Sequence, residues 1–154
     1  MLSYRPATRC DAPVLARMRV AFLIDARDLS PDEADQAEME RILLEYFTAS
    51  LADNSFAAWL AFDGGELVAT SGLSFSIAPP SFGNKSGKSA YIMNMYTLPQ
   101  YRRQGIAWVL LEKTVEEAKS RGYARITLHA TDMGRPLYKK FGFQGSHDDM
   151  VLYT

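Results

Sequence analysis

The residues whose types and spacing best suit chemistry lie in one segment, Tyr101-Arg-Arg-Gln-Gly-Ile-Ala107. It stands between a β-prone stretch and the most regular helical pattern of the chain. The first turn of a helix carries unpaired backbone N–H groups and the positive end of the helix dipole. Gly105 lets a ligand approach the backbone closely, and Arg102 and Arg103 add positive charge. The segment therefore predicts a phosphate or pyrophosphate site rather than an ordinary basic loop.

Two common nucleotide-binding motifs do not fit this segment. A P-loop ends in glycine, lysine and serine or threonine, and that ending is missing here. The dinucleotide fingerprint needs three spaced glycines after an early strand. The chain has 17 Lys and Arg against 18 Asp and Glu, whereas nucleic-acid binding needs a basic surplus on at least one face. We therefore expect another anion-bearing ligand, with a nucleic-acid contact through Arg102 and Arg103 as an alternative.

Hydrophobic periodicity indicates the elements that must position this segment. Helical spacing predicts helices over about 10–25, 31–51, 104–121 and 136–141. Extended segments are expected over about 2–5, 56–62, 66–77, 90–97 and 125–130, with one or two more after Phe143. Helices interleaved with a largely antiparallel sheet predict an α/β (α+β) class, and the length predicts one domain over 1–154.

Local signals set the ends of several elements. Thr8 with Asp11 resembles a capping box, and Ser30 before Pro31 indicates the start of the second helix. Asp63-Gly64-Gly65 indicates a hairpin turn between two strands. The stretch 78–89, rich in proline and glycine, is expected to be a mobile loop, either a lid over a ligand or a plain crossover.

Together these features resemble the GCN5-related N-acetyltransferase (GNAT) family. Arg102-x-x-Gly105-x-Ala107 matches the family motif [Gln/Arg]-x-x-Gly-x-[Gly/Ala], and Leu137-Tyr-Lys-Lys-Phe-Gly-Phe143 resembles its second signature. The opening Tyr4-Arg-Pro-Ala-Thr8 is also typical. The resemblance covers nearly the whole chain and is strong from 90 to 143. It implies a mixed, mostly antiparallel sheet of six to seven strands, about four helices, and splayed fourth and fifth strands.

The resemblance also implies acetyl-coenzyme A as cosubstrate and no metal. The pyrophosphate would lie on the loop and helix start formed by Arg102, Arg103, Gln104, Gly105, Ile106 and Ala107. The pantetheine arm would pair like an added strand with Met95, Tyr96 and Thr97, where one N–H would face the thioester oxygen. Two positions depart from the family pattern. Thr131 replaces an asparagine that often contacts the cofactor, and Gly134 replaces a common alanine.

Tyr138 matches the family's general acid, which protonates the departing sulfur. Thiol and phenol pKa values in water are about 8.5 and about 10, so this proton transfer is uphill by roughly 2 kcal/mol. Local tuning or coupling to loss of the amine proton could cover that difference. The alternative is that Tyr138 is a core aromatic packed beside Phe141 and Phe143.

The acceptor amine must lose a proton before it attacks, yet no acid lies between Ala90 and Thr97. Asn94 could orient an amine or a water but cannot act as a base. His129, near the end of the fifth strand, is a candidate base because imidazole exchanges protons near neutral pH. Asp25 and Asp28, between the first two helices, are candidate acceptor-binding residues because the family commonly lines its acceptor pocket there.

The leading hypothesis is an acetyl-coenzyme A-dependent N-acetyltransferase that acts by direct transfer in a ternary complex. The acceptor would be a primary amine of a small molecule or peptide. The alternative is a non-catalytic acyl-coenzyme A-binding regulatory module on the same fold. One cysteine, no signal-peptide pattern and no apolar run of membrane length predict a soluble cytoplasmic protein. Many relatives in the family form dimers, so the resemblance implies a possible homodimer. Two histidines are too few for a multi-histidine metal site.

Overall fold

The computed structural model describes every residue from 1 to 154, and its elements follow the expected order. The strands are β1 (Leu2–Pro6), β2 (Phe56–Asp63), β3 (Glu66–Ile77), β4 (Lys88–Thr97) and β5 (Arg125–Leu128). The helices are α1 (Ala12–Arg27), α2 (Glu33–Ala52), α3 (Ile106–Ser120) and α4 (Arg135–Phe141), with single 3₁₀ turns at Arg9–Asp11 and Pro99–Tyr101. The four expected helices are confirmed to within three residues at each end.

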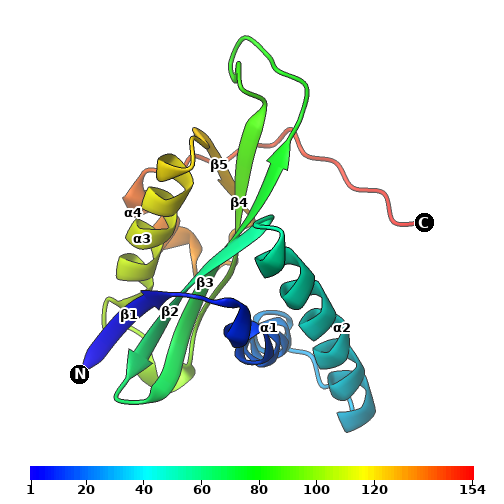
Figure 1. Ribbon diagram of the computed structural model, residues 1–154, viewed down its shortest axis with the longest axis vertical. Helices are drawn as coiled ribbons and strands as arrows, with labels where there is room; N and C mark the ends of the chain where they lie inside the picture. Colours follow the sequence, from blue (N-terminus) through cyan, green and yellow to red (C-terminus); the bar gives the residue numbers. More distant parts are fainter.

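One mixed sheet runs through the molecule in the order β1-β2-β3-β4-β5, and Figure 1 shows it as a twisted ribbon. All neighbours are antiparallel except β4 and β5, which are parallel. The prediction of six to seven strands was wrong, because residues 143–154 form no strand. Their first half, Gln144 to Asp149, is polar and has low β-propensity, and β5 offers an edge of only four residues.

Apolar side chains on the two faces of the sheet hold the helices in place. One core joins α1 and α2 to β2, through Ala12, Leu15, Ala16, Leu43, Phe47, Leu51, Phe56, Ala58 and Leu60. The other face packs on α3 through two clusters that include Leu73, Ile92, Ile106, Leu110 and Leu111. In Figure 1 the pair α1–α2 and the helix α3 accordingly lie on opposite sides of the strands. None of the helices combines the length and the apolar character that crossing a bilayer requires.

The start of α2 differs from the prediction. Asp32, and not Ser30, is the capping residue, and its carboxylate accepts a hydrogen bond of 2.8 Å from the N–H of Asp35. Both are capping residue types, but Asp32 stands at the position where the chain turns helical. The predicted hairpin turn is confirmed, since only Gly64 and Gly65 separate β2 from β3.

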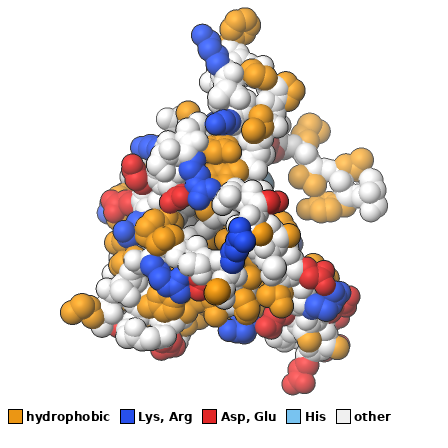
Figure 2. All heavy atoms as spheres, viewed as in Figure 1, with side chains coloured by type: hydrophobic (Ala, Val, Ile, Leu, Met, Phe, Trp, Pro, Cys, Tyr) orange, Lys and Arg blue, Asp and Glu red, His pale blue; other side chains and the backbone are white.

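The stretch 78–89, expected to be a mobile loop, is the hydrogen-bonded end of the β3–β4 hairpin. The N–H of Ala78 donates to the carbonyl of Gly87 at 2.9 Å, and the Asn84 amide donates to the carbonyl of Lys88 at 3.0 Å. Figure 1 shows this hairpin end projecting away from the helices. Figure 2 shows hydrophobic side chains at its tip and along the C-terminal segment, where Phe82 and Met150 are fully exposed.

An ion pair ties β1 to the start of α1. Two nitrogens of Arg5 each donate to the Asp11 carboxylate at 2.8 Å, and the same carboxylate accepts from the N–H of Thr8 at 2.7 Å. The predicted capping box is therefore present. The Arg5 hydrogen bonds, reinforced by those of Thr8, lower the pKa of Asp11 to about 2 against the cost of burial.

We expect Asp11→Asn to lower the free energy of unfolding by about 1–3 kcal/mol at neutral pH, because Arg5 loses its charged partner. The pKa of Asp11 is about 2 when folded and about 3.9 when unfolded. The wild-type advantage should therefore be constant above about pH 5 and shrink as the pH falls toward 2. Urea unfolding between pH 2 and 7 measures it, with the exposed Asp149→Asn as control. An advantage that is unchanged near pH 2 contradicts this assignment.

Candidate active site

An extra residue in β4 shapes the centre of the site. Tyr96 pairs with Thr70 and Met93 with Gly72, so β4 has one residue more than β3 between these pairs. Asn94 lies in this bulge with a left-handed φ of 54°. Met93 packs on the α1–α2 core, Asn94 bonds to α1, and Met95 packs on the α3 side. The bulge therefore turns two consecutive side chains toward α1.

The second feature is the edge of β4 that faces β5. Pairing between these strands begins at Ser89–Arg125 and ends at Ile92–Leu128. Residues 93–97 continue β4 without a partner on that side. The ladder between β4 and β5 therefore ends where β5 ends, at Leu128, and the expected splaying of these strands stays a prediction. An unpaired strand edge offers N–H and C=O groups to an extended ligand, which can add to it as a further strand.

The third feature is the start of α3, at the far end of this edge. The six consecutive backbone N–H groups from Arg103 to Trp108 donate to no backbone or side-chain acceptor. Gly105 precedes the helix with a φ of 80°, and an added Cβ there would meet nothing within 4 Å. Ile106 is buried against Ala69 and Leu110 and anchors the first turn to the sheet. Six free donors around an open glycine suit a doubly charged phosphate group.

The two arginines of the motif have different surroundings. Arg102 forms an ion pair with Asp25, and its Nε donates to the carbonyl of Thr97 at 3.0 Å. Its guanidinium also lies over the ring of Tyr96, 5.6 Å from the centroid. Arg102 thus joins the end of β4 to the end of α1. Arg103 is exposed, has a left-handed φ of 61° and makes no hydrogen bond, so its charge is free for a ligand.

Tyr138 of α4 is 8% exposed and packs with Ile92 and Leu111, next to the ring of Phe143 at 6.0 Å. Burial, with a smaller effect of nearby Tyr91, raises its pKa to about 12. Gly134 lies under the ring, where a Cβ would stand 3.0 Å from Cε2 of Tyr138. The departure from alanine at 134 therefore fits the position of this tyrosine.

Thr131 is used within the chain. Its hydroxyl accepts a hydrogen bond of 3.1 Å from the N–H of Gly134, and its carbonyl accepts one of 2.9 Å from Arg135. It therefore shapes the turn that begins α4. The hydroxyl hydrogen is still available to a ligand, so a contact with the cofactor stays a prediction.

The acids proposed for the acceptor lie at the end of α1. Asp25 forms an ion pair with Arg102. Asp28 is exposed and caps α1 in a left-handed conformation with a φ of 49°. Their role in binding the amine stays a prediction, and the ion pair shows that Asp25 first of all positions Arg102.

Sequence reasoning missed a polar cluster on the α1 side of β4. Arg19 donates to the side-chain oxygen of Asn94 at 2.8 Å, and Tyr91 lies within hydrogen-bond distance of Nδ1 of His129, at 2.6 Å. The sequence did indicate the pair of Arg19 and Asn94, because Arg19 lies four residues after Leu15, within the apolar stripe of α1. An arginine on the buried face of a helix predicts a buried polar partner. His129 itself is exposed, just beyond the end of β5.

We expect Tyr138→Phe to flatten the loss of stability in alkali. The neutral phenol is favoured in the fold, so this contribution is complete below about pH 10 and is lost as the pH rises toward 12. The full effect is about 3 kcal/mol. Urea unfolding between pH 9 and 11 measures the slope, with the 90% exposed Tyr153→Phe as control. Equal slopes for wild type and Tyr138→Phe would rule out the raised pKa.

Comparison with known proteins agrees with this geometry. The family model of the acetyltransferase (GNAT) family matches residues 20–143. A predicted acetyltransferase of Clostridium acetobutylicum, solved with acetyl-CoA, is 37% identical, with a TM-score of 0.91 over 99% of this chain and 96% of that one. A GCN5-related N-acetyltransferase of Ralstonia eutropha JMP134 is 30% identical, with a TM-score of 0.87 over 99% of both chains.

A curated mouse protein, thialysine N-epsilon-acetyltransferase, is 30% identical over 84 residues, which are 54% of this chain and 47% of that protein. The chain spans about half the length of the curated relatives it matches. The match of the family model covers most of the chain and includes the bulge, the unpaired strand edge and the start of α3. The chain belongs to the acetyltransferase (GNAT) family.

Proposed function

We propose that the protein transfers an acetyl group from acetyl-coenzyme A directly to a primary amine of a small molecule or peptide. The observation that carries this proposal is the unpaired edge of β4 over 93–97, which leads to six free N–H groups at the start of α3. An extended arm that ends in a pyrophosphate fits both parts at once. The solved relative from Clostridium acetobutylicum, which holds acetyl-CoA, supports this choice of ligand.

The chain supplies each part of the binding site from its own elements. The N–H groups around Gln104, Gly105 and Ala107 would hold the pyrophosphate, with the free charge of Arg103 beside them. The β4 edge at Met95, Tyr96 and Thr97 would bind the arm and donate one N–H to the thioester oxygen. A fixed donor there stabilises negative charge as it develops on that oxygen. Arg102, held by Asp25, would keep the end of β4 in position.

Acetyl-coenzyme A, when bound, supplies the activated acetyl group and a thiolate leaving group. Tyr138 would face the departing sulfur. Its pKa of about 12 keeps the phenol protonated at every working pH. Full proton transfer to a thiolate of pKa about 8.5 is uphill by roughly 5 kcal/mol. Tyr138 therefore acts best as a hydrogen-bond donor that stabilises the growing charge, with proton transfer completed as the amine loses its own proton.

Tyr91 and His129 offer a route for the amine proton. The phenol of Tyr91 can donate to Nδ1 of His129, 2.6 Å away, while its oxygen accepts a proton from the amine or from an intervening water. His129 is exposed and would pass the proton to solvent. Asn94 carries no ionisable group, so it would orient the acceptor through its amide.

Gly105→Ala should weaken coenzyme A binding about 10- to 100-fold, because the methyl group would occupy the space where the ligand meets the N–H groups. Gly64→Ala is a matched control, since Gly64 also has a positive φ, of 62°, and nothing within 4 Å of an added Cβ. Both variants should lose a similar stability of about 1 kcal/mol. Isothermal calorimetry and melting temperatures test this. Equal affinities for the two variants would place the pyrophosphate elsewhere.

Tyr138→Phe should lower kcat about 10²- to 10⁴-fold and leave the dissociation constant of acetyl-coenzyme A unchanged. The release of free coenzyme A thiol in the presence of a panel of amines is the measurement. If no amine accelerates thiol release, and Tyr138→Phe matches wild type, the chain is a non-catalytic acyl-coenzyme A-binding module and the enzyme proposal is wrong.

A further inference from the structure

Arg19 differs from every other arginine of the chain. Only Arg19 and Arg102 are not exposed. Arg102 has Asp25 as its ion-pair partner, whereas no carboxylate lies within 4.0 Å of the Arg19 guanidinium. A half-buried cation without an anion loses part of its hydration and gains little in return.

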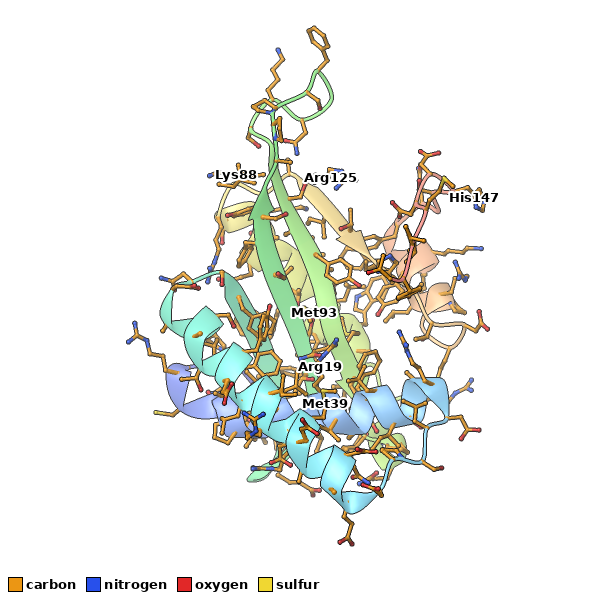
Figure 3. All side chains as sticks on the ribbon, turned by 90° about the vertical axis from the view of Figure 1, so that its right-hand side faces the viewer. Arg19, Met39, Lys88, Met93, Arg125 and His147 are labelled. Carbon is orange, nitrogen blue, oxygen red and sulfur yellow. The ribbon has the colours of Figure 1, made fainter.

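The Arg19 guanidinium has one hydrogen-bond partner, the Asn94 side-chain oxygen at 2.8 Å. Asn94 is 2% exposed, and its carbonyl accepts a hydrogen bond of 2.8 Å from the Thr70 hydroxyl. Figure 3 shows Arg19 of α1 beside Met93, at the β4 bulge. A guanidinium carries five N–H groups, so four of them make no hydrogen bond within the chain.

The groups around Arg19 supply no negative charge. The titratable neighbours are Tyr91 on β4, Tyr46 on α2 and Arg27 on α1. Phenols are neutral near pH 7, and Arg27 is a second cation eight residues along the same helix. Burial first, and then Arg27, lower the pKa of Arg19, against the opposing influence of the two tyrosines. Near pH 7 the chain therefore places no anion beside the Arg19 guanidinium.

We propose that Arg19 binds a carboxylate of the acceptor, so that the substrates are amines that also carry a carboxylate. This inference rests on the proposed acetyl transfer. Arg19 lies on the α1 side of the β4 bulge, next to the edge where the thioester would react. Guanidinium and carboxylate form paired, charge-assisted hydrogen bonds, and the planar fork fixes the direction of the bound molecule. Arg19 and Arg27 would together disfavour polycationic amines.

Matched pairs of amines test this preference. Each pair differs by one carboxylate: lysine with pentane-1,5-diamine, β-alanine with ethylamine, and 4-aminobutyrate with propylamine. Wild-type kcat/KM, measured by thiol release, should be at least about 10-fold higher for the carboxylate member of at least one pair. The three pairs differ in the distance from amine to carboxylate, so the preferred pair also reports the spacing in the site.

Arg19→Gln should lower kcat/KM for the carboxylate member about 10- to 100-fold more than for the amine without a carboxylate, mainly through KM. Arg19→Lys keeps the charge but not the fork, and should recover part of the preference. Arg17→Gln is the control, because Arg17 lies on the same helix, is 57% exposed and only approaches Glu40 at 3.9 Å. If Arg19→Gln does not fold, the comparison is made between wild type and Arg19→Lys, which should show a smaller preference for the carboxylate member.

The outcomes separate this inference from the proposed function. Amines that accelerate thiol release equally with and without a carboxylate would overturn the inference and leave acetyl transfer standing. A preference that persists in Arg19→Gln would also overturn it. If no amine accelerates release while acetyl-coenzyme A binds, the proposed function fails, and the inference fails with it.

Discussion

The bulge at Asn94 is the constraint on which the site depends. A left-handed backbone at a residue with a side chain costs about 1–2 kcal/mol, although asparagine tolerates it better than most residues. Two hydrogen bonds offset that cost, from Thr70 to the Asn94 carbonyl and from Arg19 to its side chain. Both partners come from other elements, so the bulge is stable only in the folded sheet. It turns Met93 and Asn94 toward α1 and leaves Met95 on the α3 side, next to the free strand edge.

Charge is arranged differently on the two sides of that edge. The start of α3 offers free N–H groups and the exposed Arg103, which suits a phosphate that arrives from solvent. Arg102 belongs to the same motif, but its charge is compensated by Asp25. The ion pair connects the end of β4 to α1. The charge without an ion-pair partner lies instead at Arg19, on the α1 side of β4. A nearly neutral chain thus has two separate positive groups, one in the loop before α3 and one half-buried beside β4.

The sequence predicted the first of these sites but not the second, for a physical reason. The predicted pyrophosphate site at 102–107 consists of consecutive residues, so its glycine, its arginines and the start of the helix can be identified in one short segment. The α1 cluster joins Arg19 to Asn94, which are far apart in the chain, and it requires a bulge. Strict alternation along β4 would have sent Met93 and Asn94 to opposite faces. The prediction of extra strands after Phe143 was wrong for a similar reason. The β-prone residues at 150–153 form a strand only where the edge of a sheet is available to pair with them.

Tyr91 lies between the groups proposed for the two proton movements of the reaction. It lies near Arg19 and Tyr138, so that the ionisation of each depends on it, and its hydroxyl reaches His129. In the proposed reaction, a proton that leaves the amine through Tyr91 would change the electrostatic environment of Tyr138, the phenol proposed to face the sulfur. Because both tyrosines are neutral at rest, neither one repels the other or the incoming amine. In the proposed reaction, the two proton movements would therefore be coupled through one side chain on β4, within the parallel pairing that ends just before the bulge.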